Sequence, residues 1–134
     1  SEGQAGLGGS LIVEAGTAVQ IVIRFRDPQV KNKREDNPQV RRVDLIAGDV
    51  RRGAVNADDR NKSTRVERRF SAPEWTVRDD FYRVDTTLTA QRSMYVRVRG
   101  TNSSALEPSM DSRSGEDPWS DLWFYSNPIF IEVR

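Results

Sequence analysis

The strongest constraint on the fold is an alternation of apolar and polar residues with a period of two. In the segment from Val19 to Arg26, every second residue is apolar, and most of the residues between them are polar or charged. The same pattern recurs from Thr64 to Phe70 and from Tyr82 to Leu88. Because successive side chains of a β-strand point to opposite faces, this pattern predicts strands with one buried face.

Further segments bring the number of predicted strands to about seven. We expect Val66 and Phe70 on the buried face of one strand, and Met94, Val96 and Val98 on the buried face of another. The remaining strand segments are LIVEAG at 11–16, RRVDLIAGDV at 41–50 and PIFIEV at 128–133. This spacing predicts an all-β fold, an antiparallel two-sheet sandwich of the immunoglobulin or fibronectin type.

The length of 134 residues suits a single domain with one core. Residues 1–9, SEGQAGLGG, are rich in glycine, and we interpret them as a linker or cloning remnant ahead of a sandwich domain at 10–134. The formal net charge is +1, so we expect neither nucleic acid nor a membrane as a partner. The sequence does not indicate the compartment, and a secreted or periplasmic bacterial protein would be compatible with it.

The chain contains no histidine and no cysteine. Imidazole bases, thiol nucleophiles, Ser-His-Asp triads and histidine-based zinc or iron sites are therefore excluded within this chain. Neighbouring carboxylates such as Asp79 and Asp80 usually point apart, and no spacing singles out a catalytic pair. We predict no catalytic residues, no metal site and no cofactor. An enzyme would instead need a deep pocket with shifted carboxylate pKa values.

Acidic residues are frequent in the loops and supply the oxygen ligands that calcium prefers. The segment DSRSGEDPWSD at 111–121 has Arg113 at its third position and glycine at its fifth, so it lacks the spacing of an EF-hand loop. Calcium held between two neighbouring loops is left as an alternative.

Arginines at outward strand positions could form a face that binds phosphates, or they could pair with acids across the sheet. The residues concerned are Arg24, Arg26, Arg97 and Arg99. Asp44, Glu67 and Glu132 also alternate outward, so we expect cross-strand ion pairs that keep a sheet face soluble.

Three tryptophans offer either core packing or a binding surface. Within LWFY at 122–125, alternation requires at least one pair of side chains to face the core. Trp119 lies outside that alternation and is the better candidate for exposure. An alternative function is a carbohydrate-binding module that stacks sugar rings on Trp75 and Trp119.

The segments YVRVRGTN at 95–102 and DPWSDLWFYSNPIFIEV at 117–133 resemble the C-terminal segment of bacterial PHP-type metal-dependent phosphoesterases. In that family, a strand of the form Y-x-R-V-x-G precedes a loop and a terminal strand of the form W-S-N-P-I-[FW]-[IV]. Tyr125 stands here where the family has tryptophan. The rest of the chain matches only loosely.

This resemblance implies a non-catalytic accessory domain, because the family's metal ligands lie upstream of the matching segment. The implied partner is the upstream catalytic domain of the same polypeptide, and none of the family's catalytic residues can be assigned to this chain. We expect the contact surface in the loop at 100–121, since aromatic and arginine anchors in a long loop are typical of contact patches. The residues predicted to bind are Arg99, Asn102, Asp117, Trp119 and Asp121.

Overall fold

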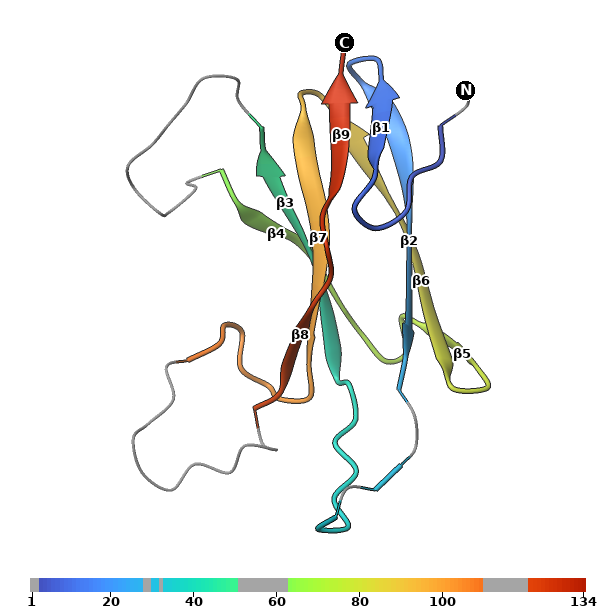
Figure 1. Cartoon of the computed structure of the whole chain (residues 1–134), viewed down its shortest axis with the longest axis vertical. Coiled ribbons are helices and arrows are strands. Elements are labelled where there is room, and N and C mark those ends of the chain that lie inside the picture. The colour runs from blue at the N-terminus through green and yellow to red at the C-terminus, as the bar shows by residue number, and fades with distance from the viewer. Residues whose placement is uncertain (1–2, 28–29, 32, 51–62, 110–120) are drawn as a thin grey trace.

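A computed structural model of the chain describes residues 3–27, 30–31, 33–50, 63–109 and 121–134. Within these residues the backbone forms nine strands and no helix (Figure 1). The strands are β1 (Ser10–Val13), β2 (Thr17–Arg26), β3 (Arg42–Asp49), β4 (Arg65–Ser71), β5 (Thr76–Arg78), β6 (Phe81–Ala90), β7 (Met94–Thr101), β8 (Trp123–Tyr125) and β9 (Ile129–Val133). The predicted all-β sandwich is confirmed.

The strands form two sheets with a shared core between them (Figure 1). The larger sheet has six strands, in the order β1-β9-β7-β3-β4 with β8 also pairing with β7, and the smaller sheet has the order β2-β6-β5. Neighbouring strands run antiparallel except β1 and β9, which are parallel. The predicted antiparallel sandwich thus carries one parallel pair, at this edge of the larger sheet. The two paired strands are the first and last of the chain and share no hairpin that would force opposite directions.

The core is built from the inward residues of the alternating strands in both sheets. The prediction that Met94 and Val96 point inward is confirmed, and Val98 packs against the same cluster while partly buried. The buried apolar members of the cluster are Val19, Ile23, Val43, Leu45, Ala47, Phe70, Trp75, Val84, Ala90, Met94, Val96 and Ile131. Residues of both sheets therefore belong to one cluster.

The seven predicted segments correspond to β1, β2, β3, β4, β6, β7 and β9. Two further strands, β5 and β8, were not counted among them, and each is only three residues long. Three residues are too few for an alternation to be recognised. These two strands are defined by the neighbours with which they pair, β6 and β7 respectively.

The prediction that Val66 shares the buried face with Phe70 is wrong. The pairing of β3 with β4 shifts register so that Glu67 is an extra residue, a β-bulge, and Val66 lies opposite Ile46. Residues that pair directly share one face of the sheet, so Val66 lies outward with Ile46 while Phe70 belongs to the core. One inserted residue thus reverses the face of every residue beyond it.

Two glycines allow aromatic rings of a neighbouring strand to lie directly over the backbone. A Cβ added at Gly48 would collide with the ring of Tyr95, and one added at Gly100 would collide with the ring of Phe124. Gly48 pairs with Tyr95, and Gly100 pairs with Phe124. The close approach lets β3, β7 and β8 pack without side chains holding them apart.

Candidate functional site

A buried ion pair lies on the outward face of the larger sheet. Asp44 of β3 and Arg99 of β7 are cross-strand neighbours, and the Arg99 Nε donates to the Asp44 Oδ2 at 2.8 Å. Asp44 is only 1% exposed and Arg99 only 6%. The expectation that outward arginines pair with acids across the sheet is confirmed for Arg99.

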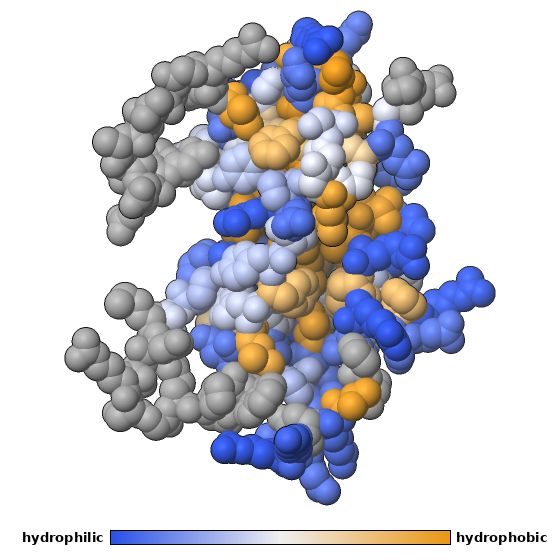
Figure 2. Space-filling model, viewed as in Figure 1, coloured by the Kyte–Doolittle hydropathy of each residue, from blue (hydrophilic) through white to orange (hydrophobic). Residues whose placement is uncertain are grey.

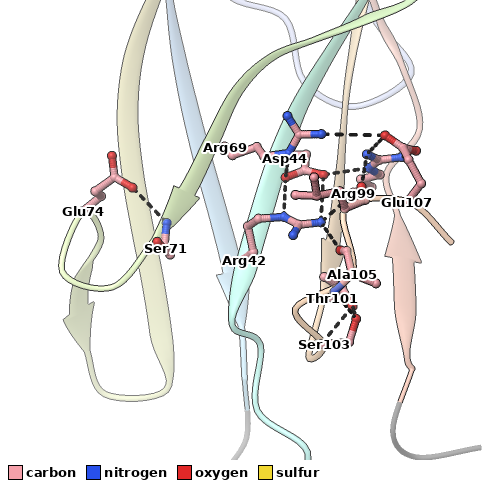
Figure 3. Close-up of polar contacts among 11 residues, drawn as sticks. Arg42, Asp44, Arg69, Ser71, Glu74, Arg99, Thr101, Ser103, Ala105 and Glu107 are labelled. Atoms are coloured by element: carbon pink, nitrogen blue, oxygen red, sulfur yellow. Dashed lines mark hydrogen bonds and ion pairs between the residues drawn. The ribbon is translucent and has the colours of Figure 1, made fainter.

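Two more arginines surround the same carboxylate (Figure 3). The Arg42 Nε donates to the Asp44 Oδ1 at 2.8 Å, and the Arg69 Nε lies 3.8 Å from that oxygen. Arg42 lies on β3, the strand of Asp44 itself, and Arg69 lies on the neighbouring strand β4. One buried carboxylate therefore holds three guanidinium groups, which leaves positive charge for another acid to balance.

The second acid is Glu107, from the segment that follows β7 (Figure 3). Arg99 donates from Nη1 and Nη2 to the two Glu107 oxygens at 2.6 and 2.9 Å, and from Nη2 to the Leu106 carbonyl at 3.0 Å. Arg42 donates to the Ala105 carbonyl at 2.7 Å. The hydrogen bond from Arg99 lowers the pKa of Glu107 and, in return, raises the pKa of Arg99. The arginines thus fasten this segment onto the sheet.

The ends of the same loop are joined by Asn102 and Asp121. The Leu122 N–H donates to the Asn102 Oδ1 at 2.9 Å, and the Trp123 indole Nε1 donates to the Asp121 Oδ1 at 2.6 Å. The Ser103 hydroxyl also donates to the Asp121 Oδ1, at 3.3 Å. These bonds hold β8 beside the end of β7.

The structure thus brings together three of the five residues predicted to bind: Arg99, Asn102 and Asp121. All three use their side chains to hold the loop and β8 in place, and Arg99 is too buried to present its own surface to a partner. Asp117 and Trp119 lie outside the described residues. The three predicted residues that the structure describes therefore support a neighbouring surface.

The surface that they support contains side chains that the sequence reasoning did not select. Side chains from three neighbouring strands lie on the outward face, as the pairing of Arg99 with Tyr125, Thr101 with Trp123, and Tyr95 with Phe130 shows. We call this set the aromatic–arginine face. Its members are Tyr95, Arg97, Trp123, Tyr125 and Phe130. The outward positions of MYVRVRG and LWFYSNPIF carry the signal that could have found it.

Arginines and aromatic rings are stacked within this face. The Arg99 and Arg42 guanidinium carbons lie 5.2 and 5.8 Å from the Trp123 ring centroid, and that of Arg97 lies 5.6 Å from the Tyr125 ring. Figure 2 shows apolar and weakly polar side chains along the middle of the view, with strongly hydrophilic ones mostly toward the rim. Tyr125 and Phe130 are both well exposed.

Arg97 differs from its neighbours because its Nε has no hydrogen-bond acceptor among the described residues. Its Nε is buried and has no hydrogen-bond partner, and no ion pair to Arg97 is formed in the described part of the chain. Buried guanidinium nitrogens normally have an acceptor. The expected cross-strand ion pair is therefore absent at this position within the residues described.

Trp75 is not available as a sugar-binding platform, contrary to the carbohydrate-binding alternative. It is 9% exposed, and its ring packs edge-on against Phe25 and Tyr82 with centroids 5.5 and 5.9 Å apart. Phe25 and Tyr82 stack on each other at 5.0 Å. This aromatic cluster fills the core at one end of the smaller sheet, so Trp75 is a core residue.

The acidic loops do not converge within the described residues. No group of three or more Asp, Glu, His or Cys residues is placed there to hold a metal ion. Asp27, one of the loop acids, is buried and accepts the Val40 N–H at 2.9 Å, so it fastens the loop that follows β2. Over the residues described, the structure contains no helix long and apolar enough to cross a membrane.

No protein-family model matches the sequence, and neither the curated proteins nor the solved structures contain a significant match. The resemblance to the C-terminal segment of PHP-type phosphoesterases therefore stays a prediction that rests on the quoted residues alone.

Proposed function

We propose that this chain is a non-catalytic β-sandwich module of a larger bacterial hydrolase, a metal-dependent phosphoesterase, and that it docks onto the upstream catalytic domain through the aromatic–arginine face. The pattern at 95–102 and 117–133 supports the choice of parent protein. A chain without histidine or cysteine has few of the side chains that hydrolytic chemistry uses. Its contribution to a hydrolase would then be contact and positioning.

The observation that carries the proposal is the unsatisfied Arg97 among exposed aromatic rings. Protein interfaces are enriched in tyrosine, tryptophan, phenylalanine and arginine, and these residues dominate binding energy at the centre of a contact. Arg97 already has its guanidinium stacked on Tyr125, so little conformational freedom remains to be lost on binding. A partner carboxylate would supply the ion pair that Arg97 lacks among the described residues.

The clamp formed by Asp44, Arg99 and Glu107 contributes indirectly. It fixes the segment beside the face and places Arg99 beneath Trp123, whose indole is also held by Asp121. A surface that is ordered before binding loses less entropy on association than a mobile one. Arg99 and Asp121 would thus act as positioning residues, and the face itself would make the contact.

The test is to express this chain and the upstream catalytic segment separately and to measure their association by calorimetry. We expect Phe130→Ala or Arg97→Ala to weaken binding by about 2 kcal/mol, roughly thirtyfold in Kd, as for residues at the centre of an interface. The matched control is Phe81→Ala. Phe81 is 45% exposed and Phe130 is 43% exposed, but Phe81 lies on β6 of the other sheet.

Equal loss of affinity in both phenylalanine variants, or no association at all between the two segments, would contradict the docking proposal. Titration of the chain with a panel of polysaccharides is a useful companion measurement. Binding of a glycan that Phe130→Ala abolishes would mean that the face recognises a carbohydrate and not the catalytic domain.

A further inference from the structure

A second surface lies on the opposite sheet, along the edge strand β2. This strand is ten residues long, pairs with β6 on one side, and has no neighbour on the other side among the described residues. Long edge strands present unpaired backbone groups that can template another strand. The free edge of β2 is therefore a potential binding site for another strand.

The hydrogen-bond register identifies which backbone groups are free. The Asp27 N–H donates to the Asp80 carbonyl at 3.1 Å, and these residues continue the register in which Arg26 lies opposite Phe81. In an antiparallel pair, residues that exchange hydrogen bonds with the partner alternate with residues whose N–H and C=O point the other way. The odd-numbered residues of β2 from Val19 onward therefore bond to β6, while at the start of the strand the Thr17 N–H donates to the Glu14 carbonyl and the Gly16 N–H to the Ala90 carbonyl. The residues whose backbone points to the free edge are Ala18, Gln20, Val22, Arg24 and Arg26.

An apolar groove runs beside this edge, between the two sheets. It has a volume of about 790 Å³. Its walls include inward side chains of β2 and residues of the larger sheet: Ile21, Ile23, Phe25, Val98, Phe124 and Ile129. Residues 3–5 and Leu7 of the N-terminal segment also line it, so this segment is the competitor that an incoming strand must displace. A strand placed along the free edge of β2 would direct every second side chain into this groove.

The charges on the outer surface of β2 favour particular residues at the outward positions of an incoming strand. Arg24 and Arg26 are exposed on the outer surface of β2, and the strand itself contains no acid. Arg26 has an ion pair with Asp80 at 3.6 Å, whereas the Arg24 guanidinium lies over the Phe81 ring at 5.4 Å and forms no ion pair with a described residue. The outward side chains of an incoming strand would therefore gain most by being acidic.

We propose that the free edge of β2 and the adjoining groove form an acceptor site for an extended peptide strand in which apolar and acidic residues alternate. A second copy of the chain fits the site poorly, because the inward side chains of its own β2, such as Val19 and Ile23, already belong to its core. Only a strand with an uncommitted apolar face can fill the groove and satisfy the backbone edge together.

The test uses the whole chain and a fluorescein-labelled synthetic peptide of the length of β2 in which isoleucine alternates with glutamate. Fluorescence anisotropy should show saturable binding. The same composition with its isoleucines placed consecutively, or with lysine in place of glutamate, should bind at least about tenfold more weakly. The double variant Arg24→Glu, Arg26→Glu should reverse the preference between the glutamate and lysine peptides.

Val22→Pro tests the backbone directly. The Val22 N–H points to the free edge, so a proline there removes a donor to the peptide and leaves the ladder with β6 intact. We expect at least about tenfold weaker binding. Val22→Thr is the matched control, since it keeps the N–H and should bind the peptide as the original chain does.

Amide exchange measured by NMR keeps the proposal testable even if a variant fails to fold. Addition of the peptide to the original chain should protect the amides of residues 18, 20, 22, 24 and 26, while the odd-numbered amides of β2 are protected from the start. Equal binding of the rearranged peptide, or protection elsewhere, would overturn the proposal. Protection of the even-numbered amides without peptide would also overturn the proposal. Protection that does not depend on concentration would mean that residues 3–7 of the chain itself cover the edge, and protection only at high concentration would mean that the chain self-associates.

Discussion

Arg97 and Arg99 lie two positions apart on β7 and both point outward, yet their surroundings differ. Arg99 donates to Asp44, Glu107 and a backbone carbonyl, whereas the Arg97 Nε is buried without an acceptor. A buried ion pair is costly to break from one side, because the remaining charge is left without its partner. A buried donor without an acceptor is itself a cost to the folded chain.

The two residues should therefore respond differently to the same substitution. We expect Arg99→Met to lower the free energy of unfolding by about 3 kcal/mol, because Asp44 and Glu107 both lose their hydrogen bonds from Arg99, although Arg42 stays on Asp44. Arg97→Met should change it by no more than about 0.5 kcal/mol, or raise it, because the methionine keeps the packing and removes an unsatisfied nitrogen. Urea unfolding followed by circular dichroism measures both values. Similar losses in the two variants would show that Arg97 has a structural role in the free chain.

Residue alternation predicted which arginines point outward, and it predicted the pairing of Arg99 with an acid such as Asp44. It could not predict the contrast with Arg97. That contrast depends on Glu107, which follows β7 in the sequence and returns to the sheet through contacts that no local pattern encodes. The roles of Asn102 and Asp121 are also three-dimensional, because each bonds a residue across the loop that separates them.

The strands themselves show where sequence patterns are sufficient. Strands with a full alternation, such as β2 and β7, are predicted well because burial of one face sets their direction. The bulge at Glu67 was not predictable in this way, because the sequence of β4 alternates whether or not one of its residues lacks a partner on β3. The parallel pairing of β1 with β9 likewise depends on how the chain crosses between sheets.

The segment that follows β7 is an element without regular structure, and its attachment should depend on pH. The pKa of Glu107 is lowered from its ordinary value of 4.5, chiefly by the hydrogen bond from Arg99 and against a smaller effect of burial. The folded state therefore favours the charged carboxylate. The stabilisation is fully present above the ordinary pKa and is lost as the pH falls through the lower pKa of the folded state.

Glu107→Gln should make the free energy of unfolding less dependent on pH in the acid range, because glutamine does not titrate and the glutamate does. The measurement is urea unfolding over a series of pH values from neutral to below the ordinary carboxyl range. Arg99→Met should reduce the pH dependence in the same range, because it removes the main cause of the shift. A Glu107→Gln profile parallel to that of the original chain would mean that the clamp does not contribute to acid sensitivity.

Over the whole molecule, the two sheets share one core but expose unlike outer surfaces. The larger sheet presents the aromatic–arginine face and its clamp, and the smaller sheet presents a free, cationic edge beside an apolar groove. The two surfaces lie on different sheets, so both could be occupied at once. This division of roles requires that the sheets stay together as one rigid body, which depends on the core between them.

That requirement leads to a prediction for unfolding. Trp75 packs in the core against Phe25 and Tyr82 of the smaller sheet, while Phe25 also contacts Phe124 of the larger sheet, with ring centroids 6.4 Å apart. The larger sheet cannot expose its inward side chains without also uncovering this cluster. We therefore expect both sheets to unfold in one cooperative transition, as small domains with a single core do.

The measurement uses a chain in which Trp119 and Trp123 are replaced by phenylalanine, so that fluorescence reports on Trp75 alone. Its urea midpoint should coincide with that from far-ultraviolet circular dichroism, which follows the strands of both sheets. The chain with Trp119→Phe alone, which keeps Trp123 on the outward face of the larger sheet, is the control and should give coincident midpoints as well. If Trp75 instead became exposed at a lower urea concentration than the loss of strand signal, the smaller sheet would open independently. The core would then be too weak to hold the two sheets together. The groove beside β2 would form only when the smaller sheet opens locally.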